Sequence, residues 1–288
     1  MSLTHSPRAF ITLSHSPFMA LPDRGDCGYV YREAVDETKK FIGDFAPDVV
    51  VMFAPDHMNL LNEVRPPFTG ILSGDTVEEF GIPRIDLQVH PVAEKLFADL
   101  VETDVDLAVG EHVSVDHGLG LTLLQLFDEP ALTPLVPIIV NAIGFPLFPV
   151  ARARRVGEKV GAALESYEGR VLFIGTGGLS HNPPFPDPRP GVERFTAEER
   201  SASLATALDY VDPDWDRGLL ERMASGDADT FSALSQQEIN ARGGGANEVR
   251  TWAAAWAACG SPAAAFTSYE LVEPWITGMG VAFGTSVS

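Results

Sequence analysis

The sequence predicts an α/β fold with a central mixed β-sheet flanked by helices on both faces. Short apolar segments rich in β-branched residues, typical of strands that are buried on both faces, alternate with segments of helical periodicity. Beyond about residue 190 the strand signals fade and helical segments predominate. No internal repeat and no clear linker divides the chain, so we expect residues 1–288 to form a single domain with a more helical C-terminal portion.

The elements follow from these patterns in chain order. Apolar runs predict strands at residues 10–14, 48–53, 107–109, 135–140, 171–174, 266–271 and 281–283. Helical spacing predicts helices at residues 29–45, 91–101, 119–127, 150–167, 196–210, 215–224, 231–239 and 248–258, the last with Asn247 as its N-cap. Residues 60–86 carry few periodic signals and are expected to form a long excursion with binding loops, and the proline-rich residues 185–190 a loop over the site.

Composition excludes several classes of protein. With 20 Lys and Arg against 40 Asp and Glu, the formal net charge is -20, which argues against a nucleic-acid binder or a partner of anionic membranes. Only two cysteines are present, so we expect neither a disulfide framework nor a cysteine zinc site, and a reducing cytoplasm fits best. We also expect no signal peptide and no membrane span, because no apolar run approaches the roughly 20 residues that a span requires.

Histidines recur where strands end or helices begin. Four of the seven, His15, His57, His117 and His181, lie in such places among Gly, Pro, Ser and Asp residues. A single histidine in a loop is more often structural than functional. Because the loops at one edge of an open α/β sheet converge, four such histidines together indicate a functional site.

Two kinds of chemistry suit a histidine-rich edge. Two imidazoles and one carboxylate form the facial triad of mononuclear non-haem Fe(II) oxygenases, which leaves positions open for substrate and O2, and further histidines would serve as acid and base. Alternatively, three histidines could hold zinc for hydrolysis, although the His-Glu-x-x-His motif of zinc proteases is absent. The segment Gly178-Leu-Ser180-His181 lacks the second glycine of a nucleophile elbow, since residue 182 is Asn, and Gly175-x-Gly-Gly is only a weak dinucleotide fingerprint.

Five motifs extend over most of the chain: Leu13-Ser-His15-Ser-Pro17, Phe53-Ala-Pro-Asp-His57-Met-Asn59, Val115-Asp-His117-Gly118, Gly175-Thr-Gly-Gly-Leu-Ser-His181-Asn-Pro-Pro184 and Asn247-Glu248-Val-Arg-Thr-Trp252. In this order they resemble the motifs of the type III extradiol ring-cleavage dioxygenases. The resemblance implies Fe(II) as the cofactor, a catechol and O2 as substrates, and a homo-oligomeric enzyme. A metal-binding or signalling scaffold that keeps this fold is the alternative from another class.

The resemblance also implies roles for individual residues. His15, His57 and Glu248 would bind iron, and His117 and His181 would be the acid-base pair, with Glu273 as a rival carboxylate for the metal. Asp116 would assist this machinery, although its side chain could equally cap the helix at Gly118. As a hypothesis, His181 takes the proton of the catechol and His117 acts as the acid.

The resemblance implies 3-(2,3-dihydroxyphenyl)propionate or a close 3-substituted catechol as the substrate, with protocatechuate or gallate as the alternative. Arg65 and Arg250 are candidates to meet a substrate carboxylate, although ion pairing at the surface is the commoner role of arginine. The tryptophans Trp252 and Trp256 are expected in the core.

Overall fold

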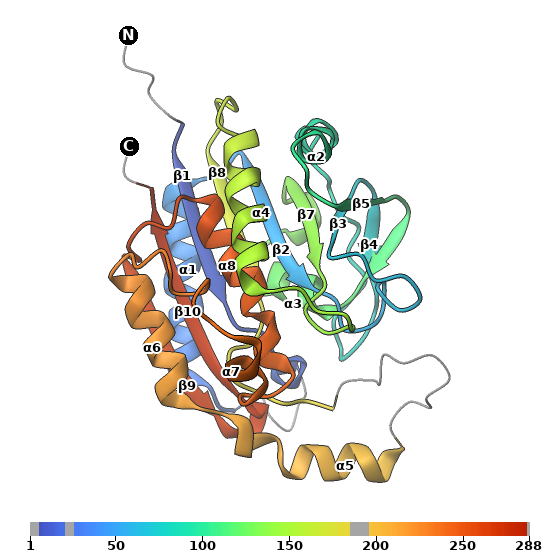
Figure 1. Ribbon diagram of the computed structural model, residues 1–288, viewed down its shortest axis with the longest axis vertical. Helices are drawn as coiled ribbons and strands as arrows, with labels where there is room; N and C mark the ends of the chain where they lie inside the picture. Colours follow the sequence, from blue (N-terminus) through green and yellow to red (C-terminus); the bar gives the residue numbers. More distant parts are fainter. Residues whose placement is uncertain (1–5, 21–25, 185–195, 287–288) are drawn as a thin grey trace.

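A large mixed sheet forms the centre of the protein (Figure 1). The computed structural model describes residues 6–20, 26–184 and 196–286, and within these ranges eight strands pair in the order β5-β3-β7-β2-β8-β1-β10-β9. Their bounds are β1 (Arg8–Leu13), β2 (Val49–Pro55), β3 (Phe68–Ile71), β5 (Leu107–Gly110), β7 (Leu135–Val140), β8 (Val171–Thr176), β9 (Phe266–Val272) and β10 (Thr277–Thr285). A separate pair, β4 (Gly74–Thr76) and β6 (Val113–Val115), lies beside the large sheet.

Strand direction determines which chain segments meet at each edge of the sheet. The adjacent strands β7, β2, β8 and β1 are parallel, so their carboxyl ends lie at the same edge, the lower one in Figure 1. Strand β10 runs antiparallel to β1, and therefore its first residues lie at that edge as well. The start of β1 and the end of β10 lie together at the opposite edge, where Ser286 bonds to Arg8.

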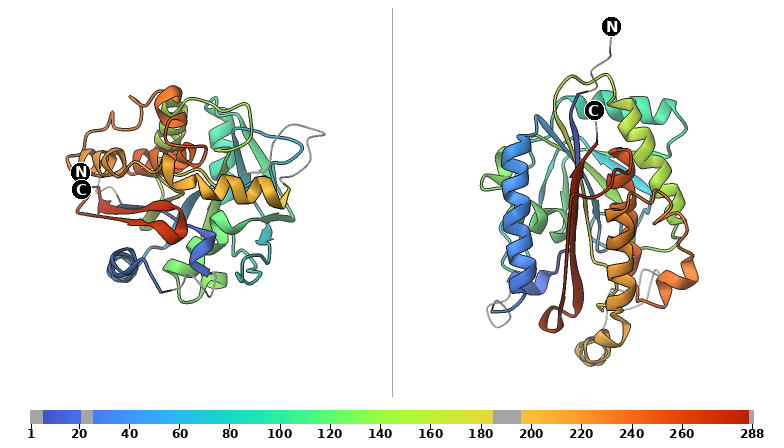
Figure 2. Two further views of the ribbon diagram at one scale, coloured as in Figure 1. Left: turned by 90° about the horizontal axis from the view of Figure 1, so that it is seen from below. Right: turned by 90° about the vertical axis from the view of Figure 1, so that its left-hand side faces the viewer.

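Helices cover both faces of the sheet, as the edge-on view in Figure 2 shows. One face carries α1 (Tyr29–Phe45) and α3 (His117–Leu126), and the other carries α4 (Val150–Ala163), α8 (Val249–Ala258) and α6 (Pro213–Ala224). Helix α2 (Val92–Glu102) packs beside α4, while α5 (Ala197–Ala205) and α7 (Gln236–Asn240) lie towards the lower end in Figure 1. The predicted fold class, a mixed sheet with helices on both faces, is confirmed.

The burial of β2 explains why its sequence is continuously apolar. Val51 and Phe53 pack into the core beneath α4 and α8, whereas Val50 and Met52 pack into the core beneath α1 and α3. Successive side chains of a strand point to opposite faces, so a strand that is covered on both sides needs apolar residues at every position.

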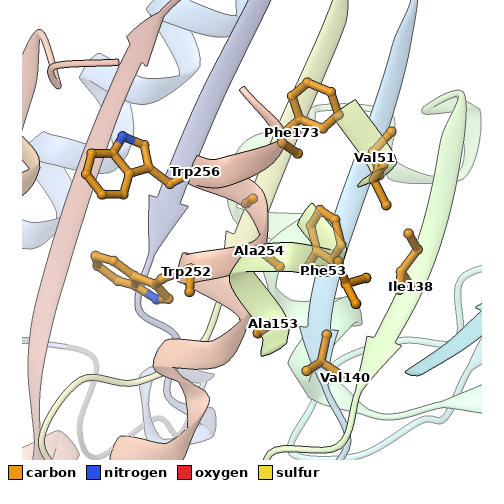
Figure 3. Close-up of a cluster of buried hydrophobic side chains, with 14 of the residues drawn as sticks. Val51, Phe53, Ile138, Val140, Ala153, Phe173, Trp252, Ala254 and Trp256 are labelled. Carbon is orange, nitrogen blue, oxygen red and sulfur yellow. The ribbon is translucent and has the colours of Figure 1, made fainter. Parts of the chain in front are cut away.

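Helices α4 and α8 approach each other closely against the sheet (Figure 3). A Cβ atom at Gly157 of α4 would lie 2.0 Å from the carbonyl oxygen of Ala254, so only glycine permits this spacing. Trp252 and Trp256 are fully buried in this layer, as predicted. The indole N–H of Trp252 donates to the carbonyl of Gly177 at 2.9 Å, and this bond ties α8 to the loop that follows β8.

Several expected elements differ from the structure. The predicted helix at residues 231–239 is wrong in its first half, where side chains of Asp227 and Asp229 bind neighbouring backbone and hydroxyl groups and favour turns, and only α7 is helical. Asn247 is not the N-cap of α8: a short 3-10 helix, Gly245–Glu248, leads directly into it, and the amide of Asn247 bonds to Gly244 instead. The expected loop at residues 185–190 lies outside the described residues.

Within the described ranges, none of the helices combines the length and the apolar character needed to cross a membrane.

Candidate metal centre and acid-base site

All six predicted site residues line one cavity at the carboxyl edge of the parallel strands. The cavity has a volume of about 300 Å³, at the small end of the usual range for ligand sites. Strand β8 lies between β1 and β2, so the segments that follow these three strands emerge side by side. The predicted residues in the cavity wall are His15, His57, Asp116, His117, His181 and Glu248.

His15 presents an unpaired nitrogen to this cavity. Its Nδ1 atom lies 2.8 Å from the hydroxyl oxygen of Thr176, the last residue of β8. Its Nε2 atom is buried and has no hydrogen-bond partner within the described part of the chain. Burial lowers the pKa of His15 to about 3, so the imidazole is neutral at physiological pH. A buried neutral imidazole with a free nitrogen is suited to bind a cation.

Glu248 and His57 lie against each other although they come from distant segments. Nε2 of His57 is 3.3 Å from Oε1 of Glu248, and the carboxylate also accepts a 2.5 Å hydrogen bond from the N–H of Gly178. Burial opposes the charge of Glu248, but the hydrogen bond with His57 and the charges of His181, His57 and His15 lower its pKa to about 2. Gly177, with φ +152°, permits the contact, because a Cβ there would lie 2.6 Å from Cβ of Glu248.

Two carboxylates create a strongly negative environment around His57. Burial alone would lower the pKa of this imidazole, but the charges and hydrogen bonds of Asp116 and Glu248 outweigh burial and raise it well above its usual value. The field that favours a proton on this ring also favours a metal cation in its place. With neutral His15 and anionic Glu248 beside it, the donor set fits a site of two histidines and one carboxylate.

Three histidines of the cavity lie close enough together to share a metal ion. Ring nitrogens of His15, His57 and His117 lie within 4.8 Å of one another, and the rings of His57 and His117 stack with centroids 4.2 Å apart. His117 therefore lies beside two of the predicted metal ligands, His15 and His57.

Asp116 contacts both the start of α3 and His57. Its Oδ1 atom accepts the N–H of Gly118 at 2.9 Å and so caps α3, and the same oxygen lies 3.3 Å from Nδ1 of His57. The backbone N–H of His57 also donates to Oδ2. One carboxylate thus fixes both the start of α3 and the orientation of a candidate ligand.

His181 is held in a narrow slot between two glycines. A Cβ at Gly178 would lie 2.1 Å from the ring, and one at Gly245 would lie 2.2 Å from it, so neither position accepts a side chain. Nδ1 lies 3.0 Å from the carbonyl of Leu179, and Nε2 lies 3.9 Å from Oε1 of Glu248. The ring is therefore close to the candidate metal site, at its edge.

The loop before His181 is anchored by a buried carboxyl group that the sequence did not reveal. Asp216 of α6 accepts hydrogen bonds from the N–H of Ser180 at 2.9 Å, the hydroxyl of Ser180 at 2.8 Å and the hydroxyl of Tyr269 at 2.8 Å. Burial raises the pKa of Asp216 to about 7, although these donors oppose the shift. Ser180 is thus engaged in structure, in agreement with the poor match to a nucleophile elbow.

The remaining candidates lie elsewhere. Glu273 is exposed and does not line the cavity. Arg250 is fully buried and donates to the carbonyls of Phe148 and Asn247, so it does not meet substrate, and Arg65 is not in the cavity wall either. Of the remaining histidines, His90 bonds to the start of α2 and His112 is exposed and outside the cavity wall, while His5 lies outside the described residues.

Two cavity residues were missed by sequence reasoning. Glu79 lies against His117, and Arg200 of α5 is the only arginine or lysine among the described residues that line the cavity. Glu79 falls in the excursion at residues 60–86, where the sequence indicated binding loops but no particular residue. Arg200 had no distinguishing signal, because a charged residue on an amphipathic helix is usually solvated.

Comparison with known proteins assigns the chain to a class of enzyme. The sequence model described as the catalytic LigB subunit of aromatic ring-opening dioxygenase matches residues 9–284, and the chain therefore belongs to this family. The prediction of an extradiol dioxygenase, an enzyme that opens a catechol ring, is confirmed.

Curated relatives extend over almost the same length. The 2,3-dihydroxyphenylpropionate/2,3-dihydroxicinnamic acid 1,2-dioxygenase of a Rhodococcus species is 34% identical over 311 aligned residues, which cover 98% of this chain and 99% of the relative. The protein of the same name from Mycolicibacterium paratuberculosis is 36% identical over 280 residues, 87% of this chain and 89% of the relative. The predicted likeness to this group of dioxygenases is confirmed.

A solved structure shares the fold. The crystal structure of an uncharacterized protein, JW3007 from Escherichia coli K12, superposes with a TM-score of 0.51 at 15% identity and covers 96% of this chain and 98% of that one. At this identity the likeness concerns the fold alone.

Proposed function

We propose that the chain is an Fe(II)-dependent extradiol dioxygenase that acts on 3-(2,3-dihydroxyphenyl)propionate or a close 3-substituted catechol and inserts both atoms of O2. The observation that carries the proposal is the cavity in which the unpaired Nε2 of His15, the ring of His57 and the carboxylate of Glu248 face one another. These three residues would hold the metal. Fe(II), when bound, supplies open positions at which the two hydroxyls of a catechol and O2 can meet.

The two remaining histidines would move protons. Ring opening requires a base that removes a proton from the catechol and an acid that returns one to the departing oxygen. His181, at the edge of the candidate metal site, would take the catechol proton, and His117, stacked on His57, would act as the acid. Asp116 would hold His57 in the orientation that metal binding requires.

The cavity wall suits a substrate with an apolar and anionic side chain. Next to the six site residues it contains Phe18, Phe80 and Leu204, and the guanidinium of Arg200 is its permanent positive charge among the described lining residues. A guanidinium is the preferred protein partner for a carboxylate. The apolar residues can contact the methylene groups of a propionate side chain, and Arg200 can pair with its carboxylate. Protocatechuate or gallate is the alternative substrate.

A substrate panel tests the proposal. The full-length chain is reconstituted anaerobically with Fe(II) and then given O2 with 3-(2,3-dihydroxyphenyl)propionate, 3-propylcatechol, protocatechuate or gallate, and the ring-opened product is followed by its absorbance. We expect the first substrate to have the highest kcat/KM, and Arg200→Met to lower this value for the propionate but not for 3-propylcatechol. If the chain binds one iron but opens no catechol, the alternative of a metal-binding scaffold is supported instead. If it binds no iron, the metal assignment is contradicted.

The proposal also includes the assembly state and the cellular location of the enzyme. We expect a homo-oligomer in the cytoplasm, in line with the low cysteine content and with the resemblance to the extradiol dioxygenases. Light scattering of the purified chain would test the assembly state.

A further inference from the structure

A tight turn at residues 79–82 lies against His117. Oε1 of Glu79 accepts the backbone N–H of His117 at 2.8 Å and lies 2.8 Å from Nδ1 of the same residue. The side chain of Glu79 is 29% exposed and that of His117 is 8% exposed, so the contact lies at the inner wall of the cavity. A single carboxylate oxygen thus meets both the backbone and the ring of His117.

The turn is built to hold Glu79 in this place. Ile82 donates to the carbonyl of Glu79 at 2.7 Å, and Phe80 and Gly81 both have left-handed backbones, with φ of 50° and 77°. This is the pattern of a type I′ turn. A non-glycine residue rarely adopts such a backbone, so the positive φ of Phe80 indicates that the surrounding contacts fix the turn.

The turn is also fastened to the segment that leads into His117. Val77, just before the turn, donates to the carbonyl of Val115 at 2.8 Å, and Thr76 of β4 pairs with Val115 of β6. On the other side, the ring of Phe80 meets the imidazole of His117 edge-on, with centroids 5.2 Å apart. The turn and the start of α3 are therefore expected to move together.

These contacts restrict the imidazole ring of His117 to one orientation. A carboxylate at Nδ1 can only accept, so the proton resides on Nδ1 and Nε2 remains for the reaction. The ring cannot swing away, because His57 stacks on it at 4.2 Å and Phe80 meets its edge. We propose that Glu79 is a positioning residue that fixes the tautomer and the orientation of His117, and this rests on the proposed role of His117 in proton transfer.

Two substitutions separate positioning from charge. Glu79→Ala removes the acceptor, whereas Glu79→Gln keeps an amide oxygen that can accept both bonds, because both end on the same atom, Oε1. We expect Glu79→Ala to lower kcat by about 10- to 100-fold at little-changed KM and full iron content, and Glu79→Gln to restore most of kcat. The matched control is Glu78→Gln at the exposed neighbouring position, with kcat unchanged.

A spectroscopic measurement does not depend on turnover. In the metal-free full-length chain with ¹⁵N-labelled histidine, the Nδ1 proton of His117 should give a slowly exchanging signal that is absent from His117→Asn. We expect this signal to persist in Glu78→Gln and Glu79→Gln and to vanish in Glu79→Ala.

The outcomes distinguish failure of the positioning role of Glu79 from failure of the proposed function. A signal that survives Glu79→Ala, a Glu79→Gln enzyme as slow as Glu79→Ala, or loss of iron from either variant would overturn the positioning role. If the wild-type chain opens no catechol while the signal still depends on Glu79, the proposed function fails and the contact between Glu79 and His117 stands.

Discussion

Nε2 of His57 lies 3.3 Å from Oε1 of Glu248, although the two residues are 191 positions apart in the chain. His57 follows β2, and Glu248 immediately precedes α8, which packs on β2 and β8. The contact therefore joins the sheet edge to the helix layer and brings the candidate carboxylate ligand to the histidines.

The first prediction concerns this carboxylate. Glu248→Gln should weaken Fe(II) binding at least about 100-fold, because it removes the only anion in the proposed ligand set. Glu273→Gln is the control, since Glu273 is exposed and outside the cavity wall. Iron content after gel filtration and the Fe(II) dissociation constant measure the effect. If both variants retain iron equally, Glu248 is not a metal ligand.

The second prediction separates two candidate ligand sets, His15, His57 and Glu248 or the three histidines His15, His57 and His117. If His15, His57 and Glu248 hold the metal, His15→Asn should lose iron, and His117→Asn should keep about one iron per chain while turnover falls. If instead the three histidines hold it, His117→Asn should lose iron as His15→Asn does. One ring nitrogen of each of the three histidines lies within 4.8 Å of the others, so either set could hold the metal, and metal analysis of both variants distinguishes them.

The third prediction concerns His181 itself. His181→Ala should retain iron and bind catechol anaerobically, while kcat falls by about 100- to 10,000-fold, the usual contribution of a general acid or base. Its Nε2 atom is 3.9 Å from Oε1 of Glu248, so removal of the ring leaves the proposed ligands in place. Normal single-turnover ring opening by this variant would contradict the assignment of His181 as the base.

The fourth prediction uses the slot that holds His181. Gly245→Ala should lower kcat with little loss of iron, because its Cβ would lie 2.2 Å from Cε1 of His181 and the ring must move. Gly218→Ala on α6 is the control, since nothing lies within 4 Å of a Cβ there, and it should raise stability by up to about 1 kcal/mol. If kcat is unchanged in Gly245→Ala, catalysis does not depend on the observed position of the His181 ring.

The fifth prediction is a pH dependence of stability. Burial raises the pKa of Asp216 from 3.8 to about 7, so the folded state binds this proton more tightly than the unfolded state does. Its contribution to stability is complete below pH 3.8 and is lost as the pH rises to about 7. The free energy of unfolding of the wild type, relative to Asp216→Asn, should therefore fall across this interval.

Urea denaturation at a series of pH values measures this difference. Asp214→Asn is the control, because Asp214 is fully exposed on the same helix. Curves for the wild type and Asp216→Asn that stay parallel from pH 4 to pH 7 would show that Asp216 does not retain its proton in the folded chain.

Much of this protein could be predicted from its sequence because the decisive signals are local. The apolar run at residues 48–53 predicts a strand buried on both faces, and His57 follows it in the chain whatever the rest of the fold does. The helix that begins at His117 and its cap Asp116 are likewise encoded by neighbouring residues. The prediction at residues 231–239 was wrong because helical spacing of apolar residues does not register aspartate side chains that favour turns.

Only the tertiary structure could identify the partners of the site residues. Thr176 meets His15 because β8 pairs with β1, and Glu79 meets His117 because a left-handed turn brings it there. The resemblance already favoured Glu248 over Glu273, but the contact of Glu248 with His57 depends on how α8 packs against the sheet. Local patterns determine which residues end strands and begin helices, whereas contacts between distant residues depend on strand order, register and turn geometry, which arise only when the whole chain packs.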